Sequence, residues 1–143
     1  MCFCGKKILM ITRIDHIGIA VQNIKEALDF FEYALGMKLE RVESEEGGRT
    51  QVAFMPLSNT EIELVSPNDA DSGLAKFLDK RGEGVHHICF EVDDIAAALA
   101  KLKEHGAQFI DESTRTNAKG QKYAFVHPKT AHGVLIELYE KAK

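Results

Sequence analysis

Hydrophobic residues alternate with small or polar residues in two stretches of the chain, and each stretch begins at a histidine. The first stretch follows His16 and the second follows His87. A period of two is typical of a β-strand that buries one of its faces. The sequence therefore predicts a strand after each histidine. The alternating hydrophobic residues are Ile17, Ile19 and Val21 in the first stretch and Ile88, Phe90 and Val92 in the second.

Each predicted strand is followed by a hydrophobic stripe with the period of a helix. Asn23 and Asp94 precede these stripes and are candidate N-caps, because their side-chain oxygens can accept hydrogen bonds from free backbone N–H groups. Gly36 and Gly106 follow the stripes and are candidate helix stops. The stripes consist of Ile24, Ala27, Leu28, Phe31 and Leu35 in the first helix and Ile95, Ala98, Leu99 and Leu102 in the second.

Three further strands are predicted after each helix. A short helical pattern between the two halves places Leu74, Phe77 and Leu78 on one side of a connector. The predicted strands are 37–43, 50–56 and 60–66 in the first half and 107–112, 121–127 and 133–139 in the second.

The two halves repeat each other. His16 and His87 stand 71 positions apart, and the hydrophobic positions of the two helices keep that offset. Glu63 and Glu137 stand 74 positions apart, a small difference that turns absorb at low cost. The repeat predicts a single domain over 12–143 that follows an N-terminal extension, 1–11. Two βαβββ modules make up this domain, 12–66 and 85–140, joined by the connector 67–84.

This order of elements predicts an α+β fold, in which the two modules form a curved mixed sheet, a half-barrel, around a metal cleft. Hydrophobic strand residues face the helices, which leaves polar residues on the other face. The pseudo-twofold repeat maps His16 onto His87 and Glu63 onto Glu137, so the four are expected to meet around one divalent metal ion. The polar face also carries Glu61 and Glu91, with small residues at Gly18, Ala20 and Cys89.

The remaining histidines lack this pattern. His86 alternates away from His87, and we assign it a structural or solvated role. The same assignment covers His105, His127 and His132.

Composition narrows the classes of function. The chain has 143 residues, 45% of them hydrophobic, and a formal net charge of -4, which gives no general attraction to nucleic acid. No apolar run approaches the roughly 20 residues of a membrane span, and the N-terminus does not read as a signal peptide. The odd set of Cys2, Cys4 and Cys89 favours reduced thiols. We expect a cytoplasmic protein with no nucleic-acid or membrane partner.

The doubled βαβββ arrangement with these histidines and glutamates resembles the vicinal oxygen chelate superfamily over residues 12–140. Within it, the stretches DSGLAKFLDKRGEGVHHICFEVDDI and FVHPKTAHGVLIEL are similar to the methylmalonyl-CoA epimerases. The resemblance implies an isomerase, commonly a homodimer, that takes an acyl-CoA thioester. It would interconvert (R)- and (S)-methylmalonyl-CoA by proton abstraction at C2 through a metal-stabilised enolate.

The resemblance also implies the cofactor and its ligands. It implies one divalent metal ion per chain, with Co²⁺ favoured and Zn²⁺, Ni²⁺, Mn²⁺ or Mg²⁺ as alternatives. The family's ligand positions fall on His16, Glu63, His87 and Glu137.

One position departs from part of the family. Some epimerases carry a glutamate, proposed as a second base, at the position that matches Gln51, and an amide cannot serve as a base. By alternation with Val52 and Phe54, we expect Gln51 on the cleft face, where it can hydrogen-bond substrate. We therefore assign Glu137 and Glu63 as the two catalytic bases, one on each side of the planar intermediate.

Other assignments remain open from the sequence. Lys119 and Lys122 are candidate contacts to the phosphates or the carboxylate of the substrate. Glu61 stands behind Glu63 as an alternative proton carrier. The rival functions are a glyoxalase I (lactoylglutathione lyase) type isomerase, acting on the hemithioacetal of methylglyoxal and glutathione, and a non-catalytic small-molecule binding protein of the bleomycin-resistance kind. A fourth ligand at Glu63 disfavours an extradiol dioxygenase.

Overall fold

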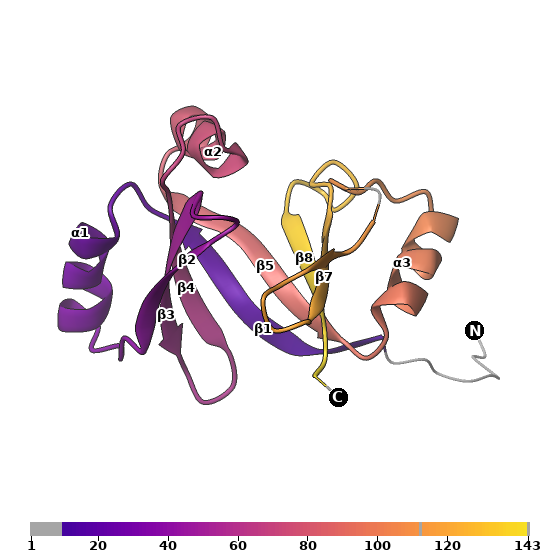
Figure 1. The fold of residues 1–143 in the computed structure, drawn as a ribbon, viewed down its shortest axis with the longest axis horizontal. Helices are drawn as coiled ribbons and strands as arrows, with labels where there is room; N and C mark the ends of the chain where they lie inside the picture. The colour runs from indigo at the N-terminus through magenta and orange to yellow at the C-terminus, as the bar shows by residue number, and fades with distance from the viewer. Residues whose placement is uncertain (1–9, 112, 143) are drawn as a thin grey trace. The chain divides into compact units, whose positions relative to one another are not determined.

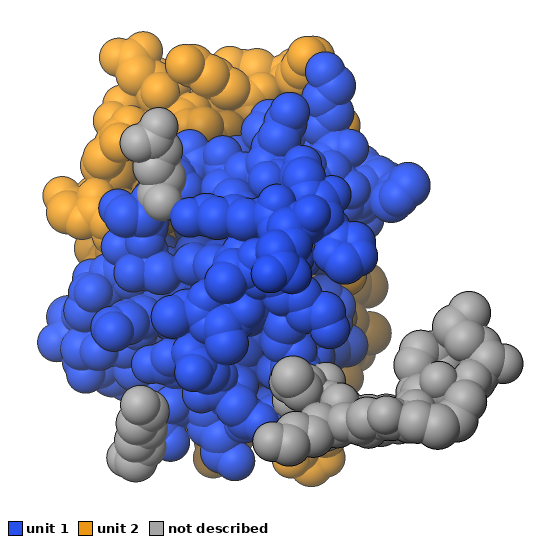
Figure 2. Space-filling view, turned by 90° about the vertical axis from the view of Figure 1, so that its right-hand side faces the viewer, with its two compact units in different colours: residues 1–14, 89–143 blue, residues 15–88 orange. Residues whose placement is uncertain are grey.

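The computed structural model describes residues 10–111 and 113–142, and the chain divides into two compact units (Figures 1 and 2). Unit 1 takes residues 1–14 and 89–143, and unit 2 takes residues 15–88. Most of the predicted N-terminal extension, with Cys2 and Cys4, lies outside the described residues. Strands β1 (Ile11–Ala20) and β5 (Gly84–Val92) each contribute residues to both units.

Unit 2 contains the first βαβββ module and the connector helix (Figure 1). Its strands follow the order β2-β3-β4-β1, with β2, β3 and β4 antiparallel and β1 parallel to β4. The first part of β5 comes next to β1. Besides these parts of β1 and β5, its elements are α1 (Ile24–Leu28), a π-helical continuation η1 (Asp29–Ala34), β2 (Arg41–Glu45), β3 (Thr50–Pro56), β4 (Glu61–Pro67) and α2 (Gly73–Arg81).

Helices pack on both faces of the sheet in unit 2. Helix α1 packs against Ala53, Met55 and Leu64 on one face. On the other face, Val52 and Phe54 form a core cluster with residues of α2, whose first turn is capped by Ser72. The α2 residues of this cluster are Leu74 and Leu78, with Phe77 against them. The expected division into one helix-covered face and one polar face is therefore wrong for this unit.

Unit 1 contains the rest of the second module. Its strands follow the order β5-β8-β7-β6, and β8, β7 and β6 are antiparallel neighbours. Helix α3 packs on Ala124, Val126 and Leu138. Besides the start of β1 and the last part of β5, its elements are α3 (Ile95–Glu104), β6 (Arg115–Thr116), β7 (Lys122–Val126) and β8 (Leu135–Glu140).

The predicted helix ends are confirmed. The side chain of Asn23 accepts a hydrogen bond from Glu26 N at 3.0 Å, and that of Asp94 accepts one from Ala97 N at 3.0 Å. Past the other ends, Gly36 and Gly106 have φ of 76° and 78°, a left-handed conformation that glycine adopts without strain. The α+β class with a repeated βαβββ order is also confirmed.

Two predicted strands are misplaced. Segment 37–43 becomes a strand only from Arg41, and segment 107–112 forms, among its described residues, one β-bridge at Phe109. The strand at this edge is the two-residue β6. Met37, Leu39 and Phe109 pack on helix-covered cores, although none of them lies in a strand. The alternation of hydrophobic and polar residues alone could not distinguish an irregular segment with buried side chains from a strand. Within the described ranges, no helix is long and apolar enough to cross a membrane.

Candidate metal centre in unit 2

Three of the four predicted metal ligands belong to unit 2, and the structure brings them together. His16 lies on β1, Glu63 on β4 and His87 on β5, and all three side chains are buried. His16 Nε2 and His87 Nε2 are 3.0 Å apart. His16 Nδ1 lies 3.2 Å from Glu63 Oε2. The two imidazoles thus turn their Nε2 atoms toward each other, and the carboxylate contacts the opposite edge of the His16 ring.

The spacing of the two Nε2 atoms fits a shared divalent cation. Metal–imidazole bonds are about 2.1 Å long, so two ligands at right angles around one ion lie about 3 Å apart. The 3.0 Å between His16 Nε2 and His87 Nε2 matches this separation. Imidazole nitrogens with a carboxylate nearby suit Zn²⁺, Co²⁺, Ni²⁺ or Mn²⁺. His16 and His87 can therefore hold a metal ion through their Nε2 atoms, while the Glu63 carboxylate contacts the Nδ1 edge of the His16 ring.

The protonation of His87 favours the same role. Burial holds the pKa of His87 well below its usual value, and electrostatic repulsion from His16 and His86 lowers it further. At neutral pH the ring is therefore uncharged, which leaves a nitrogen lone pair for a metal. Burial also lowers the pKa of His86 to about 4.

Gly18 makes room for the His87 ring. It stands directly beside Glu63 in the pairing of β1 with β4. A Cβ atom at this position would lie 2.1 Å from His87 Cε1, far inside contact distance. The absence of a side chain at Gly18 is thus a steric requirement of the histidine pair.

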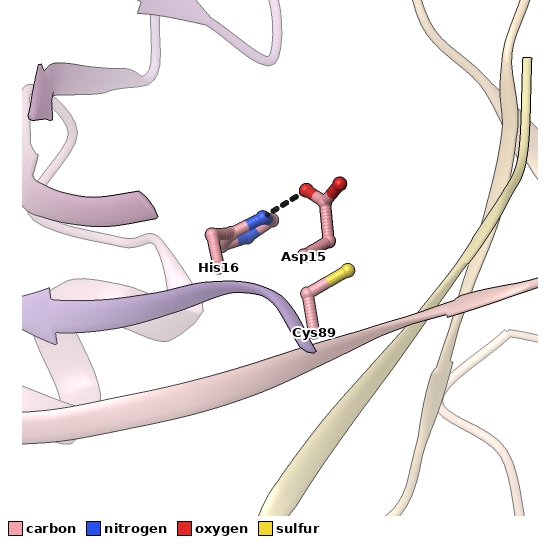
Figure 3. A group of neighbouring side chains, drawn as sticks. All are labelled: Asp15, His16 and Cys89. Atoms are coloured by element: carbon pink, nitrogen blue, oxygen red, sulfur yellow. Dashed lines mark hydrogen bonds and ion pairs between the residues drawn. The ribbon is translucent and has the colours of Figure 1, made fainter. Parts of the chain in front are cut away.

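The Nδ1 atoms of the two histidines contact the residues that precede them in the chain. His16 Nδ1 lies 2.8 Å from Asp15 Oδ2 (Figure 3, which also draws Cys89 of β5). His87 Nδ1 lies 2.9 Å from His86 Nδ1. His86 alternates with His87 along β5, as predicted, yet its ring contacts the His87 ring, which alternation did not reveal. The sequence does hold a signal for this pair, since Asp15 and His86 are 71 positions apart like the histidines they contact.

The fourth predicted ligand, Glu137, is a buried residue of β8 in unit 1. It pairs with Phe125 of β7, just as Glu63 pairs with Phe54 of β3. Residues that pair directly across strands share a face, so Glu137 lies on the face opposite Ala124 and the α3 core. The strand register around the two glutamates is thus repeated in both units.

Gln51 does not lie where the sequence placed it. It pairs with Ser66, and its neighbour Val52 pairs with Val65. Because directly paired residues share a face and Phe54 pairs with Glu63, Gln51 faces the α1 side of the sheet. The expected cleft-face position of Gln51 is therefore wrong.

The same register puts unexpected charged residues on the Glu63 face. Arg41 pairs with Phe54, and its guanidinium carbon lies 3.7 Å from the centre of the Phe54 ring. Glu43 pairs with Val52 and accepts a hydrogen bond from Arg41 Nε at 2.8 Å. Sequence reasoning missed both residues because it placed β3 with the wrong face toward Glu63.

Three other predicted site residues are placed as follows. Glu61 pairs with Pro56 and lies on the Glu63 face, two residues along β4. Lys119 is an exposed residue of the turn before β7, where its backbone N–H donates to Asn117 Oδ1. Lys122 is exposed at the start of β7 and alternates with Tyr123, which puts it on the α3 side, opposite Glu137.

Comparison with known proteins identifies a family. The family model described as the Glyoxalase/Bleomycin resistance protein/Dioxygenase superfamily matches residues 15–125. The mitochondrial methylmalonyl-CoA epimerase of Dictyostelium discoideum is 40% identical over 133 residues, which cover 92% of this chain and 80% of that protein.

Solved structures of similar sequence have the same fold. The methylmalonyl-CoA epimerase of Mycobacterium tuberculosis superposes with a TM-score of 0.85 at 35% identity, over 98% of this chain and 95% of that one. The methylmalonyl-CoA epimerase of Streptomyces coelicolor, in complex with 2-nitronate-propionyl-CoA, gives a TM-score of 0.83 at 34% identity, over 93% and 99% of the two chains.

Proposed function

The chain belongs to the glyoxalase/bleomycin resistance protein/dioxygenase superfamily and to the methylmalonyl-CoA epimerases within it, and we propose that it interconverts (R)- and (S)-methylmalonyl-CoA. The reaction is an isomerisation, and we propose that it depends on a divalent metal ion. The observation that carries the proposal is the buried histidine pair, with His16 Nε2 and His87 Nε2 3.0 Å apart. The named epimerases are 35–40% identical to the chain, whereas the lactoylglutathione lyase of Neisseria meningitidis is 29% identical, which supports the choice of substrate over that of glyoxalase I.

We assign one divalent metal ion per chain to His16, His87, Glu63 and Glu137, with Co²⁺ as the first candidate. Glu137 joins the set because its register against Phe125 repeats that of Glu63 against Phe54. When bound, the cation supplies positive charge that stabilises the negative charge developing on the thioester oxygen. His16 and His87 supply neutral nitrogens, and the glutamates balance the charge of the ion.

Epimerisation needs a proton acceptor on one side of C2 and a proton donor on the other. We assign these roles to the carboxylates of Glu137 and Glu63. The C2–H bond breaks as one glutamate, in its carboxylate form, takes the proton, and the new C2–H bond forms on the opposite side with a proton from the other glutamate, which begins the turnover as the carboxylic acid. Gln51 is excluded from this role twice, because an amide is not a base and because its strand register turns it away from Glu63.

The test is deuterium exchange at C2. Methylmalonyl-CoA is incubated in D₂O with metal-free protein and with protein supplied with Co²⁺, and exchange is followed by mass spectrometry. We expect exchange only with metal. The hemithioacetal of methylglyoxal and glutathione is the parallel substrate, and its turnover without exchange on methylmalonyl-CoA would assign the chain to the glyoxalase I reaction. An exposed-site variant, His105→Ala, serves as the control, since His105 lies at the end of α3.

Several finer assignments belong to the same proposal. We propose that residues 12–143 of each chain form one domain and that two chains form a homodimer in the cytoplasm. Size-exclusion chromatography with light scattering tests the oligomeric state. Lys119 and Lys122 are proposed to meet the phosphates of the CoA moiety. Replacing both with alanine should raise KM for methylmalonyl-CoA and leave kcat nearly unchanged, because neither residue takes part in proton transfer.

A further inference from the structure

The two histidines of the metal centre present their rings in the same way. In each, Nε2 faces the other histidine, and Nδ1 faces the residue immediately before it in the chain. Those preceding residues, Asp15 and His86, occupy equivalent positions of the repeat. The sequence around them differs, DH in one module and HH in the other, so the shared feature is the contact and not the residue type.

Imidazole chemistry explains why this contact matters. A neutral imidazole carries one N–H, and a nitrogen that binds a cation must be the other one. A ring that offers Nε2 to a metal therefore carries its proton on Nδ1, and an acceptor at Nδ1 fixes both the tautomer and the ring plane. Asp15 Oδ2 is such an acceptor for His16 at 2.8 Å. His86 Nδ1 can accept from His87 at 2.9 Å if the proton of His86 sits on its own Nε2.

Both partner residues are themselves held in place. The backbone carbonyl of Asp15 accepts a hydrogen bond from Thr60 Oγ1 at 3.2 Å, across the start of β4. The ring of His86 packs edge-on against Phe77 of α2, with 4.8 Å between the ring centres. A partner fixed by its own packing can orient a ligand, whereas a mobile surface residue cannot.

We propose that Asp15 and His86 are a repeat-related pair of positioning residues, which hold His16 and His87 in the Nδ1–H tautomer and so keep their Nε2 atoms ready for one metal ion. The inference rests on the proposed metal centre and not on the identity of the substrate. The two partners act with different strength. Asp15 adds a negative charge that makes His16 a stronger electron donor, while a neutral His86 only orients His87.

Glu63 does not replace Asp15 in this role. Its Oε2 lies 3.2 Å from His16 Nδ1, against 2.8 Å for Asp15 Oδ2. The single Nδ1–H donates along the shorter contact. Removal of Asp15 should therefore leave Glu63 as the acceptor for His16 Nδ1, and the carboxylate assigned to the metal and to proton transfer would be drawn to the wrong nitrogen.

The test distinguishes loss of the histidine ring orientation from loss of folding stability. His86→Phe keeps a ring against Phe77 and removes the acceptor, Asp15→Ala removes the carboxylate, and Asp15→Asn keeps an acceptor oxygen without charge. His105→Phe is the matched control at an exposed histidine. Co²⁺ affinity is measured by competition with a chelator, together with the visible spectrum of the bound ion. The tautomers of His16 and His87 are read from ¹⁵N shifts of the Zn²⁺-bound protein, because in the metal-free protein the 3.0 Å contact between the two Nε2 atoms is a hydrogen bond that needs a proton on one of them.

We expect Co²⁺ affinity to fall about 10-fold in His86→Phe and about 100-fold in Asp15→Ala, with partial recovery in Asp15→Asn. The His87 ring should change from one tautomer to a mixture in His86→Phe, while the metal-free protein keeps its melting temperature. Unchanged tautomers and unchanged Co²⁺ affinity in both variants would overturn the proposal. Neither readout uses substrate, so a chain that binds Co²⁺ as expected but fails to exchange C2 deuterium would refute the proposed reaction and leave this inference standing.

Discussion

The two units share one sequence repeat, yet their edge strands differ in length. In unit 2, β2 pairs with β3 at five positions, whereas in unit 1 the equivalent edge strand β6 pairs with β7 at two. Despite this, the register beside the glutamate is the same, Phe54 against Glu63 and Phe125 against Glu137. The framework at the sheet edge has diverged while the position of the carboxylate has not, which is expected if chemistry and not stability constrains that position.

The units also differ in what covers the glutamate face. In unit 2, α2 packs Leu74 and Leu78 against Val52 and Phe54, so part of the Glu63 face is a hydrophobic core. Among the described residues of unit 1, α3 is the only helix, and it packs on the face opposite Glu137. The carboxylates therefore work in different surroundings, although their strand positions match. Equivalent substitutions in the two modules show how far the equivalence extends.

The largest effect is expected at the histidines. His16→Ala and His87→Ala should each lower Co²⁺ affinity by at least about 100-fold and abolish deuterium exchange, because each removes one of two nitrogens that lie 3.0 Å apart. The two losses should be similar if the repeat makes the residues equivalent. Full Co²⁺ affinity in His16→Ala, measured by chelator competition, would show that the pair does not form the metal site.

The glutamates come next. Glu137→Gln keeps an oxygen for the proposed metal ion and nearly the same shape but removes the proposed base, so turnover should fall by about two to four orders of magnitude with metal still bound. We expect Glu63→Gln to behave alike. Steady-state kinetics on each stereoisomer, with metal content measured in parallel, tests the pair. A fully active Glu63→Gln variant would break the equivalence and shift the search for the second proton carrier to Glu61 or Glu43, which share the Glu63 face.

The third prediction concerns the close packing of Gly18 against the His87 ring in unit 2. In Gly18→Ala the new Cβ would sit 2.1 Å from His87 Cε1, so the ring must move, and we expect about 1 to 3 kcal/mol lower stability together with weaker Co²⁺ binding. Gly73→Ala is the control, because its Cβ would have no heavy atom within 4 Å. Chemical denaturation of the metal-free proteins measures the first effect. Equal stability of Gly18→Ala and wild type would mean that the close approach of the His87 ring is not kept in solution.

The sequence could predict strands in which hydrophobic and polar residues alternate, because in such strands one face is buried more than the other. Strands β1 and β5 alternate cleanly, and their histidines and caps follow from that pattern. Strand β3 could not be oriented, because Val52, Ala53, Phe54 and Met55 are all buried. When helices cover both faces of a strand, alternation disappears and the sequence no longer says which face a polar neighbour such as Gln51 joins. The contact between His86 and His87 was likewise hidden, since strand alternation describes Cβ directions and not where a long side chain reaches.

The smallest expected effect lies at the two helix caps, and it compares the modules where no chemistry intervenes. The side chains of Asn23 and Asp94 each accept a backbone N–H from three residues on at 3.0 Å, with φ of -142° and -140°. Replacing either with alanine should cost about 1 kcal/mol of unfolding free energy. The cost should be slightly higher for Asp94, because its charge also interacts favourably with the helix dipole.

The helices behind these caps differ, which makes the comparison informative. Helix α1 is a five-residue segment that continues into the π-helical η1, whereas α3 is a regular helix of ten residues whose Ile95 N–H also donates to Glu140 Oε2 at 3.0 Å. Denaturant unfolding of metal-free Asn23→Ala and Asp94→Ala, with Asn23→Asp and Asp94→Asn as charge controls, measures both costs. Equal losses would show that each cap stabilises its helix locally. A negligible loss for Asn23→Ala beside a full loss for Asp94→Ala would mean that packing on Ala53, Met55 and Leu64 holds α1 without its cap, so that the two modules share a pattern of residues but not the source of their helical stability.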